Sequence, residues 1–464
     1  MRASALLLAL FALAVQSPAT STAAEEGRTN FLLIMADDLG WGDTGYNGHE
    51  QLKTPHLDRM AAEGLQFNRF YSAAPVCSPT RGSFLTGRSP FRYGVHSANV
   101  GRLEPEEISL AEVLQPLGYA TGHFGKWHLG TLTNDVRDGR RGGRNPGHYS
   151  PPWENGFEKC FSTEVQMPTW NPMENQNFPA KYWTGPGEFA KENLEGDDSR
   201  VIVDRAVAFL REAAASEKPF FAVVWFHTPH EPVVAGPEHR AIYSELDENH
   251  QHYYGCITAM DEQIGRMRAE LRELGCEKNT LVFFCSDNGP AAAGGGPGAK
   301  AGGRQQGSAC PYRGRKGSVY EEGIRVPGLI AWPAMAPKPR QVETPCVTSD
   351  LFPTVLEIVG KEAPQRPYDG ISLVPLLKGE MEERPAPIAF QFGRQRALSD
   401  NRLKLYSADA GKTWELFDLV ADPGEQSDIS AKEPERTTAM AAALEVWEES
   451  CRKSEAGADY AKPE

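Results

Sequence analysis

Three short apolar runs constrain the fold of this chain more than any other feature of its sequence. They span residues 31–35, 220–226 and 281–285, and they are continuous rather than alternating, with many aromatic and branched side chains. A continuous apolar run of this length is typical of a strand that is buried on both faces of a sheet. The sequence therefore predicts three central strands.

Helical patterns lie between these runs. Ser109 and Glu112 form a capping box before an apolar stripe that stops at Gly118, and residues 261–274 place apolar side chains at helical spacing before Gly275. An alternation of buried strands and helices predicts the α/β class, with a large doubly wound mixed sheet sandwiched by helices. Ligands of such folds bind beyond the carboxyl ends of the strands.

The chain begins like an exported protein. Arg2 precedes an apolar stretch over residues 5–15, and small residues follow up to Ala24. This layout predicts a signal peptide over residues 1–24 and a protein that is secreted or periplasmic, or that enters a lysosomal-type lumen in a eukaryote. No later stretch approaches the roughly 20 uninterrupted apolar residues of a membrane span, so we expect no membrane partner for the mature protein.

The mature chain is long enough for two domains. We expect a catalytic α/β domain over residues 25–382 and a small α+β domain over residues 383–464, where short strands precede a charged helix. Two regions, 131–198 and 289–318, are rich in Gly and lack a clear period, and we interpret both as loops that wall a site.

Charge and cysteine content exclude several classes of protein. The formal net charge of −14 argues against nucleic acid or an anionic membrane as a partner, since both usually require a basic face. The eight cysteines form no CxxC pair and no Cys/His cluster with zinc spacing. We therefore expect a fold held by its core, in which any disulfide is incidental.

Polar side chains follow each predicted strand. Asp37 and Asp38 come after the first strand, His227 after the second, and Asp287 with Asn288 after the third. The four Asp and Asn side chains offer only oxygen ligands, which favours Ca²⁺ as the first choice and Mg²⁺ as the second. One such pair alone is as often a solvated loop or a helix cap, but two pairs at two strand ends favour a metal site.

A Cys-x-Pro-x-Arg segment, residues 77–81, carries the most specific spacing in the chain. Pro79 and the later Gly87 predict a helix that starts near residue 79 or 80, which puts Cys77 just ahead of a helix N-terminus. Arg81 would lie about one turn into this helix and could neutralise an oxyanion. A cysteine near an arginine is more often buried or disulfide-bonded, and it is the full spacing that points to chemistry.

On these residues the chain resembles the type I, formylglycine-dependent sulfatases of the alkaline phosphatase superfamily, and among them bacterial and lysosomal carbohydrate sulfatases such as the N-acetylgalactosamine sulfatases. The similarity runs over nearly the whole mature chain, through the segments 30–40, 77–87, 125–130, 286–289 and 414–425. The resemblance implies that a formylglycine-generating, sulfatase-maturating enzyme oxidises Cys77 to formylglycine (3-oxoalanine).

The resemblance also implies roles for single residues. The metal ligands would be Asp37, Asp38, Asp287 and Asn288 together with residue 77. The catalytic residues would be Arg81, which holds the hydrated aldehyde, Lys126 and His128 beside the nucleophile, His227 facing the leaving group, and Lys316 on the sulfate.

The implied mechanism starts from a hydrated aldehyde at residue 77, one oxygen of which attacks sulfur and forms a covalent sulfate ester. His227 protonates the leaving oxygen, and His128 takes the proton that lets sulfate depart. Independently of the resemblance, residues 288–320 contain five basic residues and no acidic one, as a site for an anion requires: Lys300, Arg304, Arg313, Arg315 and Lys316.

The substrate is less constrained. Aromatic residues of region 131–198, with Arg137, Arg140, Arg141 and Arg144, would suit a sulfated sugar, although a packed cap with surface arginines explains them equally well. His96 and His230 are further candidates for sugar contacts. We expect an exo-acting enzyme for sulfated galactose or N-acetylgalactosamine units. The alternatives are a formylglycine-dependent phosphonate or phosphodiester hydrolase and a non-catalytic sulfated-glycan-binding protein.

Overall fold

The computed structural model describes residues 28–291, 304, 306–308 and 311–460. The predicted signal peptide and Lys300 lie outside the described residues. The named helices are α1 (Pro55–Glu63), α2 (Cys77–Thr86), α3 (Leu110–Leu114), α4 (Asp198–Ala215), α5 (Pro237–Ala241), α6 (Glu248–Glu273), α7 (Glu321–Ile324), α8 (Leu351–Ile358), α9 (Val374–Lys378) and α10 (Pro434–Glu455).

A ten-stranded mixed sheet forms the centre of the molecule, in the order β12-β2-β11-β9-β1-β8-β4-β5-β6-β7. The three predicted strands are confirmed as β1 (Asn30–Ala36), β8 (Phe220–Trp225) and β9 (Thr280–Ser286), and β1 pairs in parallel with both of the others. The remaining strands of this sheet are β2 (Leu65–Phe67), β4 (Ala120–Lys126), β5 (Lys159–Thr163), β6 (Trp183–Gly185), β7 (Glu188–Phe189), β11 (Gly328–Ala331) and β12 (Arg340–Val342).

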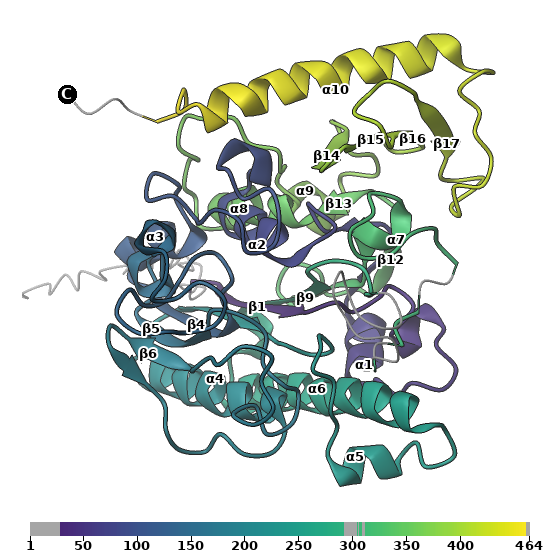
Figure 1. Ribbon diagram of the computed structural model, residues 1–464. Coiled ribbons are helices and arrows are strands. Elements are labelled where there is room, and N and C mark those ends of the chain that lie inside the picture. The colour runs from purple at the N-terminus through teal and green to yellow at the C-terminus, as the bar shows by residue number, and fades with distance from the viewer. Residues whose placement is uncertain (1–27, 292–303, 305, 309–310, 461–464) are drawn as a thin grey trace, which may run out of the picture.

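Helices cover both faces of this sheet, as the sequence predicts (Figure 1). On one face α1, α4 and α6 pack against side chains such as Leu32 and Val224. On the other face α2, α3, α8 and α9 pack against side chains such as Leu33 and Val223. Successive residues of each central strand thus enter opposite cores, which explains why their sequences are apolar without interruption.

Region 131–198 differs from the prediction of a site-walling loop. It contains β5, β6 and β7, which extend the sheet at its edge. The aromatic rings of Phe161 and Tyr182 stack with centroids 4.4 Å apart, and Tyr182 is fully buried. The sequence gives little sign of these strands, because β6 and β7 are only three and two residues long and the five residues of β5 contain two apolar ones.

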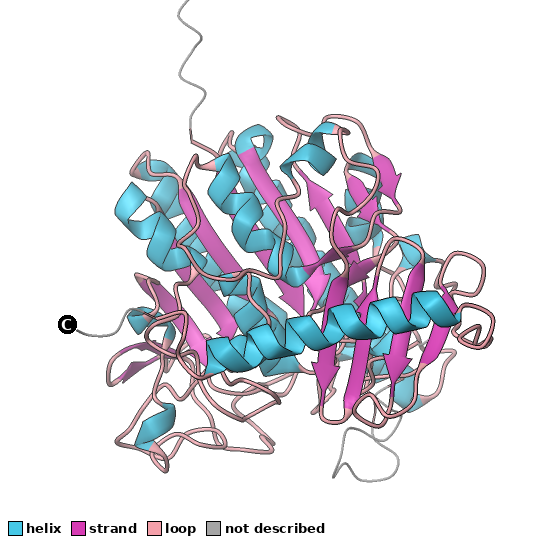
Figure 2. Cartoon of the chain, turned by 90° about the horizontal axis from the view of Figure 1, so that it is seen from above, coloured by secondary structure: helices cyan, strands magenta, loops and turns pink. Residues whose placement is uncertain are grey.

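The C-terminal part forms the predicted smaller α+β unit. An antiparallel sheet joins β14 (Ile388–Phe392), β15 (Gln395–Ser399), β16 (Leu403–Ser407) and β17 (Glu415–Asp418), and α10 lies across it (Figure 2). Its other face packs with Tyr71, Val319 and Val347 of the larger unit. A three-stranded sheet of β3 (Phe70–Tyr71), β10 (Arg325–Val326) and β13 (Cys346–Val347) lies on this side. The boundary at residue 382 stays a prediction.

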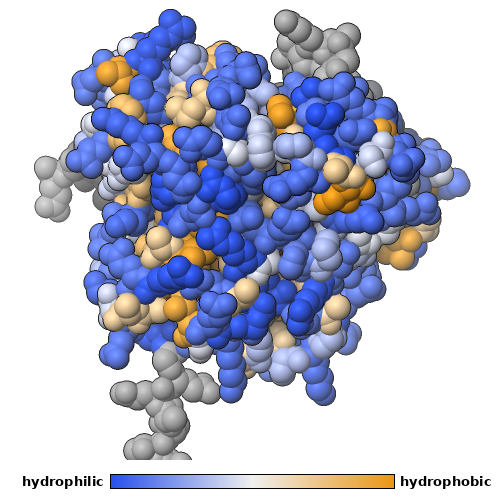
Figure 3. Space-filling model, turned by 90° about the horizontal axis from the view of Figure 1, so that it is seen from below, coloured by the Kyte–Doolittle hydropathy of each residue, from blue (hydrophilic) through white to orange (hydrophobic). Residues whose placement is uncertain are grey.

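Nothing in the described helices combines the length and the apolar character that a bilayer crossing requires. The face in Figure 3 is mostly hydrophilic, and its hydrophobic residues gather only in small, separate patches. All seven cysteines within the described residues are free, which agrees with a fold held by its core.

Candidate active site

The polar residues that follow β1 and β9 meet at one edge of the central sheet. These strands are parallel neighbours, so their carboxyl ends lie side by side. The backbone N–H of Asp38 donates to Asp287 Oδ1 at 3.1 Å, and Asn288 Nδ2 donates to Asp38 Oδ1 at 2.8 Å. All four residues, including Asp37, are buried. The structure thus brings together the four oxygen-bearing residues that the sequence singled out.

Helix α2 brings Cys77 to the same place. Cys77 is the first residue of the helix rather than the residue ahead of it, and its Sγ lies 3.6 Å from Asp37 Oδ1. The turn before the helix is fixed because Thr80 Oγ1 accepts the N–H of Ala74 and donates to its carbonyl. The helix ends at Gly87, whose φ of 71° favours glycine. Cys77 itself is only 2% exposed.

Three cationic side chains bind the carboxylates of this cluster. Arg81 of α2 donates to Asp287 Oδ2 at 2.6 Å. Lys126, the last residue of β4, contacts Asp37 Oδ2 at 2.5 Å, and Lys316 contacts Asp38 Oδ1 at 2.5 Å. Since Arg81 and Lys126 are fully buried, their charges act in a medium of low dielectric constant. Helix α2, strand β4 and the segment around Lys316 thus each supply one cation to the cluster, and each cation is paired with a carboxylate.

The same cluster has the composition of a metal site. Ligand atoms of Asp37, Asp38, Cys77 and His230 all lie within 4.8 Å of one another. Asn288 adds an observation of its own, because its Oδ1 is buried and has no hydrogen-bond partner. A buried amide oxygen without a partner costs free energy unless an ion or a donor reaches it. The residues present therefore fit a cation that prefers oxygen ligands.

Burial and the neighbouring charges shift the titration of these groups. Burial raises the pKa of Asp38, but Lys316 and His230 more than offset this and hold it well below its usual value. Burial and the nearby Asp37 raise the pKa of Asp287 to about 6. Burial also raises the pKa of Cys77 to about 12, so the encoded side chain is a neutral thiol at neutral pH.

His128 lies in a strained and desolvated position near the cluster. Its φ is 60°, a conformation that few non-glycine residues adopt. Nε2 bonds to Asn99 Oδ1 at 3.0 Å, whereas Nδ1 is buried without a partner. Burial, with Lys126 and Arg141 nearby, lowers the pKa of His128 well below its usual value. The ring is thus neutral and has one nitrogen free to accept a proton.

The two histidines after β8 are placed differently from the prediction. His227 is fully buried, and both ring nitrogens have partners: Nδ1 bonds to Asp198 at 2.7 Å and Nε2 to Thr163 at 2.8 Å. His230 instead lies in the carboxylate cluster, with Nε2 3.7 Å from Asp38 Oδ2. A tight turn separates them, in which the N–H of His230 donates to the carbonyl of His227. As a result, the two rings point in different directions. No pattern in the sequence distinguishes the two.

The other predicted site residues are scattered. His96 Nε2 lies 3.0 Å from a carboxylate oxygen of Glu455 on α10, and the ring stacks on Phe91. Arg144 is exposed, and Arg141 is paired with the buried Glu164 as part of the local packing. Contacts of His96 and Arg144 with a sugar stay predictions.

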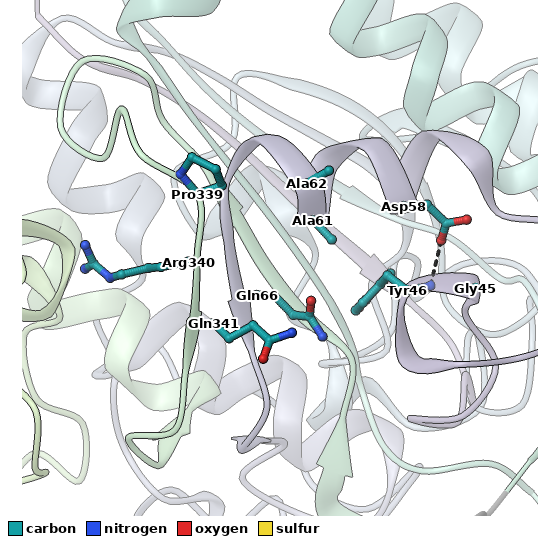
Figure 4. Close-up of a pocket in the computed structure, with 9 residues that line it drawn as sticks. All are labelled: Gly45, Tyr46, Asp58, Ala61, Ala62, Gln66, Pro339, Arg340 and Gln341. Atoms are coloured by element: carbon teal, nitrogen blue, oxygen red, sulfur yellow. Dashed lines mark hydrogen bonds between the residues drawn. The ribbon is translucent and has the colours of Figure 1, made fainter.

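A separate pocket lies between α1 and β12 (Figure 4). Asp58, Gln66 and Arg340 are among the residues that line it, and its lining includes none of the candidate site residues.

Comparison with known proteins agrees with this geometry. The sulfatase family matches residues 29–361, and the C-terminal domain of N-sulphoglucosamine sulphohydrolase matches residues 315–449. An N-acetylgalactosamine-6-sulfatase of Sus scrofa is 34% identical over 89% of this chain and 78% of its own length. A steryl-sulfatase of Rattus norvegicus is 32% identical over 78% of this chain and 72% of its own length.

Solved structures show the same fold. Ps i-CgsB in complex with k-i-k-neocarrahexaose is 25% identical, with a TM-score of 0.79 over 93% of this chain and 96% of that one. The phosphonate monoester hydrolase of Agrobacterium radiobacter, at 20% identity and a TM-score of 0.62 over 93% of this chain and 96% of that one, shares the fold. The matched family covers the strands and the helix that build the carboxylate cluster. This chain belongs to the sulfatase family and is a sulfuric ester hydrolase.

Proposed function

We propose that this enzyme removes sulfate from sulfated galactose or N-acetylgalactosamine units, at the end of a chain and at O6. The observation that carries the proposal is the placement of Cys77 at the start of α2, among Asp37, Arg81, Lys126 and Lys316. The N-acetylgalactosamine-6-sulfatases among the relatives support this sugar, and Ps i-CgsB, in complex with k-i-k-neocarrahexaose, supports a carbohydrate.

The active form would carry two groups beyond the encoded chain. Formylglycine at position 77 would supply a hydrated aldehyde with one hydroxyl to attack sulfur and a second whose deprotonation releases sulfate. Asp37, Asp38, Asp287 and Asn288 would hold Ca²⁺, which stabilises negative charge on the oxygen atoms of residue 77 and of the sulfate. A maturating enzyme and export from the cytoplasm belong to the same proposal.

The chain's own residues divide the remaining work. Arg81 and Lys126 neutralise the buried carboxylates and hold the side chain of residue 77, while Lys316 receives a sulfate oxygen. His128, with its free Nδ1, accepts the proton of the second hydroxyl. We assign the leaving oxygen to His230 and not to His227, because His230 bonds to the Glu231 carbonyl through Nδ1 and directs Nε2 toward Asp38, whereas both ring nitrogens of His227 are bonded outside the cluster.

The test combines mass spectrometry with a substrate panel. Enzyme co-expressed with a maturating enzyme should show an aldehyde in place of the Cys77 thiol, and it should hydrolyse N-acetylgalactosamine 6-sulfate faster than the 4-sulfate, a steryl sulfate or an aryl phosphodiester. Cys77→Ala should abolish all activity. Full activity with an unmodified thiol would overturn the mechanism, and a preference for the phosphodiester would overturn the assigned reaction.

A further inference from the structure

The loop that carries Lys316, residues 313–320 and here called the lysine loop, is bound to the catalytic unit beside the nucleophile. The N–H of Lys316 donates to the carbonyl of Pro290 at 3.0 Å. The N–H of Gly317 donates to the carbonyl of Pro75 at 2.9 Å, two residues before Cys77. Gly317 has a φ of 87° and open space around its Cα, so its own conformation does little to fix the loop.

The C-terminal sheet binds Gly317 from the opposite side, through its carbonyl. Gln395, the first residue of β15, donates from Nε2 to the carbonyl of Gly317 at 2.9 Å. Its Oε1 accepts the N–H of Val319 at 2.9 Å and the hydroxyl of Tyr406 at 3.2 Å. A carbonyl can only accept and a backbone N–H can only donate, so these partners fix the orientation of the amide.

The rest of the lysine loop also rests on this sheet. The ring of Tyr320 stacks on Tyr406 with centroids 4.0 Å apart, and its hydroxyl donates to Glu415 at 2.9 Å. Arg313 donates to the carbonyl of Glu425 at 3.0 Å. The loop therefore spans two units, with its central lysine directed at Asp38, its Tyr320 end on the C-terminal sheet and its Arg313 end on the segment that follows β17.

We infer that Gln395 is a positioning residue for sulfate ester hydrolysis, acting through Lys316. The inference rests on the proposed role of Lys316. A lysine side chain has four rotatable bonds, so the place of its ammonium group depends on a fixed backbone. Gln395 fixes that backbone immediately after Lys316, because it holds the carbonyl of Gly317 while the N–H of Gly317 is bonded to Pro75. The C-terminal sheet thereby contributes to the active site without contacting the substrate.

The experiment is a double-mutant cycle. Gln395→Met removes both backbone hydrogen bonds at nearly constant shape, and Gln395→Glu keeps the acceptor for Val319 but loses the donor to Gly317. Each is made alone and together with Lys316→Ala. Gln391→Met is the matched control, because Gln391 pairs across the sheet with Arg396 and not with the lysine loop. The readout is kcat/KM per mole of formylglycine-containing enzyme, with thermal unfolding measured beside it.

Either Gln395 change should lower kcat/KM about 10-fold when Lys316 is present. It should have less than about a 2-fold effect once Lys316→Ala is in place, because coupled residues are not additive. Gln391→Met should change nothing. If Gln395→Met fails to fold, Gln395→Glu carries the test.

Two results would overturn the inference while leaving the proposed function intact: an equal loss in both backgrounds, or no loss in either. Full activity of Lys316→Ala alone would instead refute the proposed role of Lys316, and the inference with it. The activity of Lys316→Ala alone therefore distinguishes a wrong role for Gln395 from a wrong role for Lys316.

Discussion

Two histidines three residues apart, His227 and His230, have opposite surroundings. We expect His230→Ala to lower kcat by about 10²–10⁴-fold on a sugar sulfate, since it removes the proposed proton donor. The loss should be much smaller on an aryl sulfate whose leaving group needs no proton. Steady-state kinetics on both substrates measures this difference, and metal content serves as the control.

His227→Ala should act on stability instead. It leaves the buried Asp198 carboxylate without its ring partner, which should cost about 1.5–3 kcal/mol of unfolding free energy in urea. A folded His227→Ala enzyme with its kcat lost, next to an unaffected His230→Ala, would restore the original assignment to His227.

The unpaired oxygen of Asn288 leads to a prediction about the metal. Chelation should abolish activity, and Ca²⁺ should restore it at lower concentration than Mg²⁺. Asn288→Leu should raise the Ca²⁺ concentration for half-maximal activity by about tenfold or more, equivalent to about 1.4 kcal/mol of binding. A titration of chelated enzyme measures this shift. An unchanged titration curve would mean that Asn288 is not a ligand.

At the scale of single residues, the sequence predicted which carboxylate and amide residues lie in the cluster, but it did not predict which histidine ring points into it. Asp37, Asp38, Asp287 and Asn288 could be found because they follow runs that must be strands, and strand ends determine position. His227 and His230 could not be told apart, because Pro229 indicates a turn between them but does not indicate which of the two rings the turn directs into the site.

At the scale of elements, β4 is a central strand that its own amino-acid sequence does not predict. It contains two glycines and a histidine, yet it lies in the middle of the sheet between β8 and β5 and carries Lys126 at its end. Continuous runs of large apolar residues predict β1, β8 and β9, because every side chain of these strands is buried. In β4 the backbone at Gly125 packs closely against the backbone of β8, and amino-acid composition does not predict such a contact.

Gly125 tests this packing. A Cβ at this position would lie 1.9 Å from the carbonyl oxygen of Trp225 on β8, and its φ is 102°. Gly125→Ala should therefore force β4 away from β8, destabilise the protein by about 3 kcal/mol or more, and displace Lys126. Chemical unfolding and activity should fall together.

The control is Gly185→Ala on β6, where a Cβ meets no atom within 4 Å. It should be close to neutral. Equal stability of the two variants would contradict the tight approach of β4 and β8.

At the scale of the whole molecule, a buried ionic cluster joins the two units. Lys404 of β16 is fully buried and lies 2.9 Å from both Glu321 and Glu425. Tyr71 of the central region donates to the same Glu321 at 2.9 Å. Lys404→Met should cost about 3–5 kcal/mol, because it removes the cation that pairs with the buried Glu425 and leaves Glu321 paired with Arg325.

Urea unfolding of Lys404→Met, set against Lys412→Met on the exposed surface of the same unit, measures this cost. A loss of less than about 1 kcal/mol would show that the cluster is not needed to hold the units together.

The order of strands in the central sheet also determines when the active site can be completed during synthesis of the chain. β1 pairs with β9, so the site residues at the end of β1 and at the start of α2 lack their neighbours from β9 until the ribosome has synthesised β9. Asp287 follows Cys77 by about 210 residues, which corresponds to roughly 10–40 s of synthesis. During that interval the cluster around the thiol lacks Asp287 and Asn288, which bond to Asp38 in the finished protein. The proposed maturating enzyme would therefore act on Cys77 before β9 joins β1.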